Sequence, residues 1–231
     1  MPRHLAFLLG LMLLGVGFAP RADEMGIDVS HWQGDVDWRK VKADGIKFAF
    51  VKATEGLAPK DPEFDRNWKA LKDVELIRGA YHFLDPAIDG RKQARHFLDT
   101  VKFAPGDIIP VVDVERMKRT SNAELHRQLV RFLDEVKART RLNCMIYVSP
   151  AFWKEHLASN EKSPRTNHLW VAAYGVKDPP KIAGLPAWTV WQYTRKGTVP
   201  GVNGETDRNR SRSLNRVRIA VDWRAPDAAR R

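Results

Sequence analysis

The chain has 231 residues, of which 43% are hydrophobic and 29% are charged, and this composition supports one sizeable core and excludes a long disordered region. Its one cysteine, Cys144, excludes an internal disulfide, and its apolar surroundings favour a small buried strand residue over a reactive nucleophile. The formal net charge of +11 favours an acidic polymer as partner, with a solvated basic surface as the alternative.

The first 22 residues have the pattern of a signal peptide. Arg3 and His4 precede an apolar run at residues 5–18, which small residues and a proline follow. The run has roughly 14 residues, fewer than the about 20 that cross a bilayer as a helix, although an uncleaved signal anchor is the alternative. We therefore expect residues 1–22 to be removed, at a cut after Ala19 or Ala22. The mature protein would be secreted or periplasmic, without a stable membrane anchor.

From residue 26 onward, short β-rich apolar runs alternate with amphipathic segments, which is typical of βα units around a parallel sheet. Strands are expected at residues 26–29, 47–52, 77–83, 108–114, 144–149, 169–173 and 189–193 and in a short piece near Asp207. Little room for helices remains between Trp188 and Asp207. The pattern predicts an α/β fold, a single irregular (β/α) TIM-like barrel over residues 23–215 that is helix-poor in its last third. A basic, partly frayed tail is expected at residues 216–231.

Helices are expected between these strands. The clearest, at residues 125–136, keeps one face apolar and begins with a capping box formed by Ser121 and Glu124. A second is expected at residues 64–71 and a third at residues 91–101.

Acidic, aromatic and polar residues occupy the ends of the expected strands. In a parallel barrel the active site lies at the C-terminal ends of the strands, where residues far apart in sequence converge. The residues expected there are Asp28, Tyr81, His82, Asp113, Glu115, Trp191, Gln192 and Asp207. Four carboxyl groups would then surround one pocket.

The strongest local pattern is the pair Asp113 and Glu115. Residues two apart on a strand face the same side, about 6.5 to 7 Å apart. Like charges this close raise the pKa of one carboxyl, which then holds a proton near neutral pH and can donate it to a leaving oxygen, as glycoside hydrolysis requires. A charged pair that merely ends a strand at the surface is the alternative.

Tryptophans at or beside expected strands could supply flat platforms for sugar rings. They are Trp32, Trp170, Trp188 and Trp191. Trp38 and Trp68 are expected to be packing residues on helices. His31 and His82 are expected to be hydrogen-bonded structural residues rather than metal ligands, since the sequence has no zinc-binding HExxH or HxxEH motif.

Several motifs follow one another in order along most of the chain. They are GIDVS at residues 26–30, WQG at 32–34, FVKATEG at 50–56, GAYHF at 79–83, DVE at 113–115, WQY at 191–193 and VPGV at 199–202, leading to Asp207. Together they resemble the family 25 glycoside hydrolases, a group of lysozymes, over about residues 26–214. The resemblance implies an irregular barrel with an acidic groove and cleavage of the bond between N-acetylmuramic acid and N-acetylglucosamine in bacterial peptidoglycan.

The resemblance also implies residue roles. Glu115 looks like the general acid that protonates the leaving oxygen. Asp113 looks like its partner, which orients the substrate's own 2-acetamido group for attack on the anomeric carbon, so that the configuration is retained. Asp28 and Asp207 match the family's other two groove acids, which tune pKa values or hold substrate. The substrate-contact positions are Tyr81, Trp170, Tyr174 and Gln192.

The chain departs from the family pattern after Asp207, where Arg208, Arg210 and Arg212 stand in a stretch that is usually more apolar. The sequence therefore does not establish whether the last strand and the closing helix of the family form in this chain. Three other functions were weighed: a non-catalytic wall-binding barrel, a metal-dependent hydrolase and a nucleic-acid binder. The four acids argue against the non-catalytic barrel, and the lack of metal-binding motifs argues against the metal-dependent hydrolase. The dispersed basic residues argue against the nucleic-acid binder. We therefore expect a monomer that cleaves peptidoglycan without metal, cofactor or nucleic acid.

Overall fold

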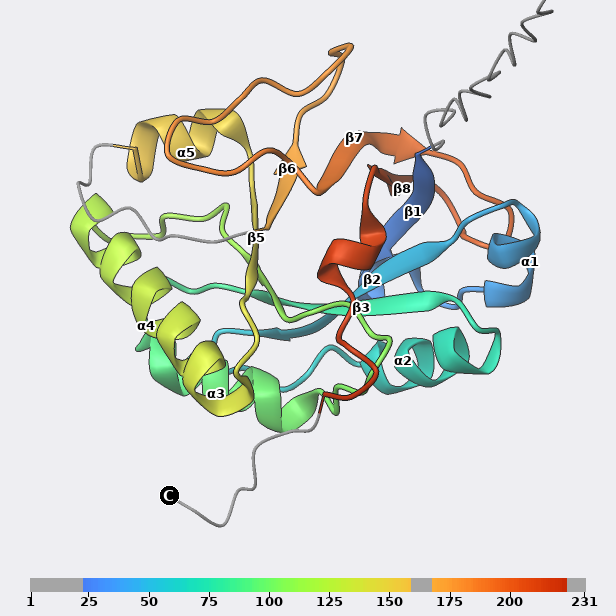
Figure 1. Ribbon diagram of the computed structural model, residues 1–231, viewed down its shortest axis with the longest axis horizontal. Coiled ribbons are helices and arrows are strands. Elements are labelled where there is room, and N and C mark those ends of the chain that lie inside the picture. Colours follow the sequence, from blue (N-terminus) through green and yellow to red (C-terminus); the bar gives the residue numbers. More distant parts are fainter. Residues whose placement is uncertain (1–22, 159–167, 224–231) are drawn as a thin grey trace, which may run out of the picture.

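The structure, a computed structural model, describes residues 23–158 and 168–223, so the predicted signal peptide at residues 1–22 lies outside the described residues. Eight strands form one closed barrel in chain order, and helices cover part of its outer surface (Figure 1). The strands are β1 (Glu24–Val29), β2 (Phe48–Glu55), β3 (Ile77–Phe83), β4 (Val111–Asp113), β5 (Met145–Val148), β6 (Leu169–Ala172), β7 (Val190–Gly197) and β8 (Thr206–Ser211). The predicted α/β barrel is confirmed.

The helices follow the first five strands and become sparse afterwards, as predicted. They are α1 (Trp38–Ala43), α2 (Phe64–Asp73), α3 (Gly90–Thr100), α4 (Asn122–Thr140) and α5 (Pro150–His156), with 3-10 turns η1 (His31–Gln33) and η2 (Leu214–Val217). The side chain of Ser121 caps α4 by accepting from the Glu124 backbone N at 3.2 Å. The other half of the predicted capping box is wrong, because the Glu124 carboxylate contacts Gln128 and Arg127 instead.

The last strand runs against its neighbours. Strands β1 to β7 are parallel, whereas β8 pairs antiparallel with both β7 and β1, which makes the barrel mixed rather than purely (β/α). Only residues 198–205 join β7 to β8, fewer than the about 12 residues that a parallel crossover takes. A hairpin is therefore the only connection that the chain length allows.

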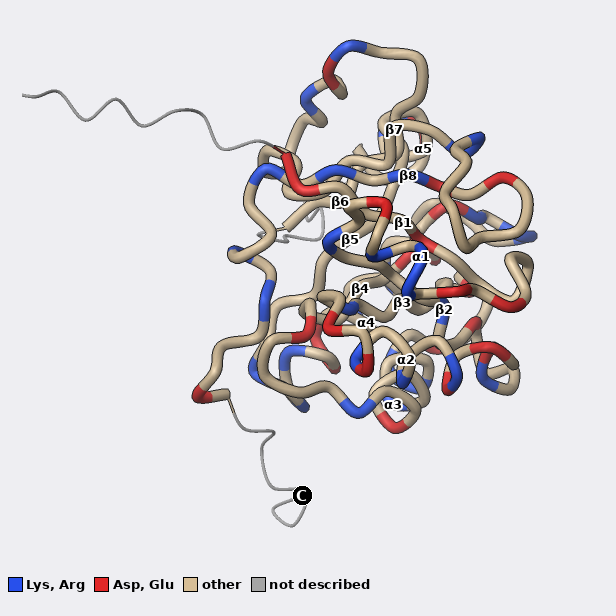
Figure 2. Tube along the Cα trace, turned by 90° about the vertical axis from the view of Figure 1, so that its right-hand side faces the viewer, with Lys and Arg blue, Asp and Glu red and all other residues tan. Residues whose placement is uncertain are grey.

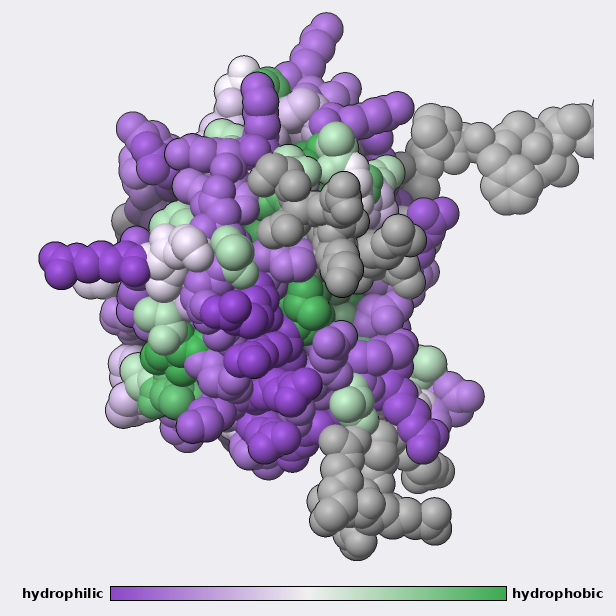
Figure 3. All heavy atoms as spheres, turned by 90° about the vertical axis from the view of Figure 1, so that its left-hand side faces the viewer, coloured by the Kyte–Doolittle hydropathy of each residue, from purple (hydrophilic) through white to green (hydrophobic). Residues whose placement is uncertain are grey.

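Two apolar clusters hold the barrel together. One lies between the strands and the helices and includes Phe97 and Phe132, which are fully buried. The other fills the barrel interior and includes Phe48 and Phe50. The amphipathic pattern of α4 matches this arrangement, since the face of the molecule on the α4 and α5 side is mostly hydrophilic (Figure 3).

Two glycines of the barrel leave space for the interior phenylalanine rings. A Cβ atom on Gly26 would lie 2.4 Å from the Phe48 ring, and one on Gly79 would lie 2.5 Å from the Phe50 ring. Any side chain there would displace a ring from the filled interior. The glycines in the GIDVS and GAYHF motifs thus serve packing, below the pocket.

The C-terminal segment closes the bottom of the barrel. Val217 and Ile219 are buried, and the Ile219 backbone N donates to the Asp107 carbonyl at 2.8 Å. The Trp223 indole N–H donates to the Thr140 carbonyl at 3.0 Å. The packed part of the chain therefore continues beyond residue 215, where the sequence set the boundary of the barrel, and residues 224–231 lie outside the described part.

Candidate active site

A pocket of about 310 Å³ opens at the C-terminal ends of the parallel strands. All eight residues predicted for catalysis and substrate contact line it, from six different strands or the loops that follow them. They are Asp28, Tyr81, Asp113, Glu115, Trp170, Tyr174, Gln192 and Asp207. Further lining residues that carry polar or aromatic groups are Trp32, Gln33, Lys52, Phe83, Tyr147 and Arg195. The closure of the barrel is what brings these distant positions together.

Asp28, near the end of β1, is buried and held by two amide groups. Its Oδ2 atom accepts from Gln192 Nε2 at 2.9 Å and from Asn209 Nδ2 at 2.7 Å. Burial raises the pKa of Asp28 well above its usual value, the charge of Asp207 raises it further, and the two amide hydrogen bonds oppose the shift.

Asp207 faces Asp28 directly across the β1–β8 pairing. Burial raises the pKa of Asp207 to about 6, and the charge of Glu115 adds to the effect. Because two neighbouring carboxylates in a desolvated site repel each other, the pair retains a proton into the weakly acidic range. This end of the pocket therefore carries less negative charge than its residue types suggest.

Asp113 ends β4 and is buried, with the atom Oδ1 lacking a hydrogen-bond partner among the described residues. Burial raises the pKa of Asp113 well above its usual value, followed by the charges of Glu115 and Asp28. A buried acceptor without a partner is costly in a folded protein, and a catalytic role is one explanation for such an atom. Since Asp113 lines the pocket, this oxygen is available to a donor group of a ligand.

Glu115 lies just beyond the end of β4 and is solvent-accessible, while its carboxyl lines the pocket. Partial desolvation of this carboxyl raises the pKa of Glu115, and the positive charges of Arg116 and Lys52 oppose the rise. Both cations are bound by Glu55, each at 2.7 Å. The positive charge that opposes the rise is therefore shared between Glu55 and Glu115.

The opposite wall of the pocket is built around the amide of Gln192. Its Oε1 atom accepts from the hydroxyl of Tyr147 at 2.9 Å and from that of Tyr174, while its amide N–H donates to Asp28. The Gln192 side chain is 3% exposed. Its fixed position orients two tyrosine hydroxyls at the pocket edge.

The tryptophans divide between the floor, the rim and the outer surface. Trp170 is 2% exposed, stacks on Phe50 and donates from its indole N–H to Asn209 Oδ1 at 2.8 Å, so it forms the floor. Trp32 is 81% exposed at the rim. Trp188 and Trp191 do not line this pocket, so the expectation of sugar platforms at these two positions is wrong.

The histidines and the cysteine have structural positions, as predicted. His82 is buried between Thr54 and Gln93, and burial lowers its pKa to about 4. His31 pairs with Asp61 at 2.7 Å. Cys144 is buried, which raises the pKa of its thiol. Among the described residues, no three or more His, Cys, Asp or Glu side chains are grouped so as to hold a metal ion.

Sequence reasoning missed Tyr147, Asn209 and Arg195. Tyr147 and Asn209 lie at inward positions of β5 and β8, and the alternation of side chains along a strand was the signal that pointed to them. Arg195 had no such signal, because the pairing of β7 is irregular at that point.

Comparison with known proteins relates this arrangement to one family. The profile described as "Glycosyl hydrolases family 25" matches residues 27–202. Lysozyme M1 of Streptomyces globisporus is 36% identical over 209 residues, covering 84% of this chain and 70% of that protein. Protein YegX of Escherichia coli O6:H1, described as uncharacterized, is 41% identical and covers 80% of this chain and 68% of its own length. The crystal structure of a lysozyme from Streptomyces coelicolor is 34% identical with a TM-score of 0.76, covering 85% of this chain and 95% of that one.

Proposed function

The chain belongs to glycosyl hydrolase family 25 and is a glycoside hydrolase of the lysozyme type, and we propose that it hydrolyses the β-1,4 bond between N-acetylmuramic acid and N-acetylglucosamine in bacterial peptidoglycan. The observation that carries this proposal is the convergence of Asp28, Asp113, Glu115 and Asp207 on one pocket at the strand ends. In glycosidases one carboxyl group of a neighbouring pair has a raised pKa and protonates the leaving oxygen, while its partner acts as a carboxylate.

Glu115 is the general acid in this proposal. Partial desolvation raises its pKa and so favours the protonated form that can donate, and its accessible position at the mouth of the pocket allows it to reach a glycosidic oxygen. It donates its proton to this oxygen as the bond to the anomeric carbon breaks. The resulting carboxylate then takes a proton from the water that completes hydrolysis.

Asp113 positions the nucleophile, which is the substrate's own acetamido group. Its unpartnered Oδ1 accepts from the acetamide N–H, and the acetamide oxygen attacks the anomeric carbon to form a cyclic oxazolinium intermediate. Water opens this ring from the opposite face. Two displacements at the same carbon leave the configuration retained.

Asp28 and Asp207 support the reaction electrostatically in this proposal. The shared proton of this pair limits the negative charge near Glu115, whose own acidity would otherwise fall further. Tyr81, Trp170, Tyr174 and Gln192 contact the sugar, with Trp170 at the floor.

The cellular placement follows from the proposed substrate and from the N-terminal segment. Peptidoglycan lies outside the cytoplasmic membrane, and residues 1–22 have the signal-peptide pattern that delivers a protein there. Within the part of the chain that the structure describes, no helix has the length and apolar character needed to cross a membrane. We propose a secreted or periplasmic enzyme that acts as a monomer.

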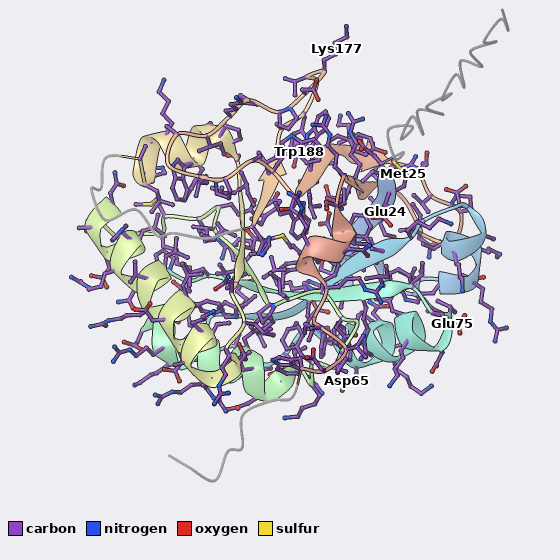
Figure 4. The ribbon with its side chains drawn as sticks, in the orientation of Figure 1. Glu24, Met25, Asp65, Glu75, Lys177 and Trp188 are labelled. Carbon is purple, nitrogen blue, oxygen red and sulfur yellow. The ribbon has the colours of Figure 1, made fainter. Side chains whose placement is uncertain are left out.

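The test is mass spectrometry of the fragments released from purified peptidoglycan by wild type and by Glu115→Gln. Wild type should release fragments with reducing N-acetylmuramic acid, and Glu115→Gln should lower the rate by about 10²- to 10⁴-fold because the proton donor is lost. Glu75→Gln is the matched control, since Glu75 lies beyond the end of α2 in the loop before β3, at the opposite end of the barrel from the pocket (Figure 4).

Other products would contradict the proposal in separable ways. Reducing N-acetylglucosamine would identify a glucosaminidase. Binding without any fragment from wild type would indicate a non-catalytic wall-binding barrel. Proton NMR of the first product tests the acetamido mechanism, because retention predicts the β anomer before mutarotation.

A further inference from the structure

We propose that Arg195 is a specificity-determining residue that pairs with a carboxylate on the muramyl side of the glycan. This inference rests on the proposed function, because it assigns a part of the same substrate to the same pocket. Arg195 is exposed and lines the pocket together with Gln192 and Asp207. None of the sequence motifs contains it.

The backbone of β7 explains how Arg195 comes to face the pocket. Regular alternation would place Gln192, Thr194 and Lys196 on the inner face and Arg195 on the outer face. The pairing with β8 shifts twice here, between Gln192 and Thr194 and again between Thr194 and Gly197, and each time β7 has one extra residue. Irregularities of this kind redirect side chains and are common beside active sites.

The charge balance of the pocket leaves Arg195 without a protein partner. Of the two cations that line the pocket, Lys52 is bound to Glu55 at 2.7 Å. In the described ranges 23–158 and 168–223, the Arg195 side chain has no ion pair or hydrogen bond. Its positive charge acts on Asp207, whose pKa it lowers against the larger effect of burial. The guanidinium is therefore the cationic group of the pocket that can bind a ligand.

A carboxylate is the ligand group that this arrangement fits. The negative charge that the acids of the pocket keep disfavours an anionic substrate unless a cation compensates, and guanidinium binds carboxylate through two parallel hydrogen bonds. Muramic acid differs from glucosamine by a lactyl group, which ends in a free carboxylate in peptide-free strands and carries the acidic stem peptide in intact strands. Arg195 would thus help the enzyme to distinguish muramyl glycan from neutral N-acetylglucosamine polymers.

The experiment compares kcat and KM on three substrates: peptide-free glycan strands with free lactyl carboxylates, the same strands after conversion of these carboxylates to neutral amides, and intact strands. Wild type should have a lower KM on the charged peptide-free strands or on intact strands than on the neutral strands, because Arg195 pairs with their carboxylates. The difference should be only about three- to tenfold, because solvent screens an exposed ion pair. Arg195→Gln should remove this preference by raising KM on the charged strands to the value found on the neutral strands. Arg195→Lys should keep part of it, and Lys196→Gln, which removes the same charge from the neighbouring residue, should keep all of it.

The outcomes separate the two proposals. A preference for peptide-free charged strands that Arg195→Gln abolishes identifies the lactyl carboxylate, and one found only on intact strands identifies the stem peptide. Equal loss of kcat on charged and neutral strands would overturn the inference and show that Arg195 acts through Asp207. Unchanged KM values in Arg195→Gln would also overturn it, with the muramidase assignment intact. If wild type cleaves none of the three substrates, the proposed function itself fails.

Discussion

The outer surface of the barrel is covered in two different ways. Helices α2, α3 and α4 lie on one side, where rings such as Phe97 and Phe132 are buried between helix and sheet (Figure 1). On the β7–β8 side the described chain places no α-helix, and arginine side chains lie over aromatic rings instead. The guanidinium of Arg210 is 4.0 Å from the Trp191 ring centre, and that of Arg212 is 4.3 Å from the Trp188 ring centre.

The difference shows how a barrel strand can be shielded without an apolar partner. Arginine covers a ring with its aliphatic stem and flat, weakly hydrated guanidinium while keeping contact with water. Basic residues alternate with uncharged residues along β8 (Figure 2). The arginine-rich stretch after Asp207, which departs from the family pattern, is therefore the outer face of a strand, whose inner face carries Asp207 and Asn209.

The segment between β6 and β7 projects outward from the barrel. Lys177 lies at the tip of the segment between β6 and β7 and points away from the barrel (Figure 4). Trp188, near the end of the same segment, packs at 6.0 Å between ring centres with Trp191. Aromatic residues from this loop and from β7 thus supply the rings on which the arginines stack.

The largest effect on stability is expected on the helix-covered side. Phe132 on α4 is fully buried and stacks on His82, with 5.0 Å between ring centres. Phe132→Ala should lower the free energy of unfolding by about 3–5 kcal/mol, because a cavity remains between helix and sheet. Chemical denaturation measures this loss.

Leu133→Ala is the control for that substitution, since Leu133 is only half-buried on the same helix. It should cost less than Phe132→Ala. Equal losses in the two variants would mean that α4 contributes through helix formation rather than through the buried ring, and the contrast between the two sides would weaken.

A smaller, pH-dependent effect is expected on the inner face of β8. The pKa of Asp207 is about 6 in the folded protein, above its usual value of 3.8, so the folded state binds more protons than the unfolded state between these values. Stability therefore falls as the pH rises through this range. Asp207→Asn should raise the free energy of unfolding by about 3 kcal/mol above pH 6 and give no gain below about pH 4.

Urea denaturation at several pH values between 4 and 7 checks this prediction. Asp65→Asn is the charge-matched control, because Asp65 is exposed on α2, outside the pocket (Figure 4). A gain that stays constant over the whole pH range would show that the Asp207 side chain is destabilising for a reason other than its charge.

The sequence predicted the eight strands because most of them are continuous apolar runs. It did not predict strand ends and directions that depend on contacts with distant segments. Strand β4 is shorter than the predicted 108–114, because Pro110 has no N–H for the ladder and Ile109 N donates to Val217 O in the C-terminal segment. Strand β7 is longer than predicted, because polar residues after Tyr193 pair with β8 in a hairpin. Neither the contact with the C-terminal segment nor the reversed direction of β8 has a local pattern.

For the pocket, as for the strands, the sequence predicted the residue positions but not the contacts that depend on the closed barrel. Acids at strand ends are visible in the sequence, since a carboxyl directly after an apolar run has few structural reasons to be there. Three further properties depend on the closed barrel: the unpartnered oxygen of Asp113, the Gln192 amide that joins Asp28 to two tyrosines, and the redirected Arg195. They arise from pairings between strands that are far apart in sequence.

The smallest effect is expected from the arginine stack on the outer face of β8. Arg210→Ala should lower the free energy of unfolding by about 1 kcal/mol, because the rings of Trp191 and Tyr193 lose their cover. An ion pair contributes little, since Asp23 Oδ2 lies 3.7 Å from Arg210 Nη1 and the buried Nε atom has no acceptor among the residues that the structure describes.

Two further substitutions at Arg210 separate the stack from the charge. Arg210→Met keeps an unbranched, mostly aliphatic side chain over Trp191 and should lose less stability than Arg210→Ala in denaturant titrations. Arg210→Lys keeps the charge but loses the flat guanidinium, so it should fall between alanine and wild type. If Lys matched wild type and the difference between Lys and Met vanished at high salt, long-range charge rather than stacking would stabilise this face. The β7–β8 side would then be held by the same kind of surface electrostatics as any basic patch, and the distinction between stacked arginine and packed helix would be lost.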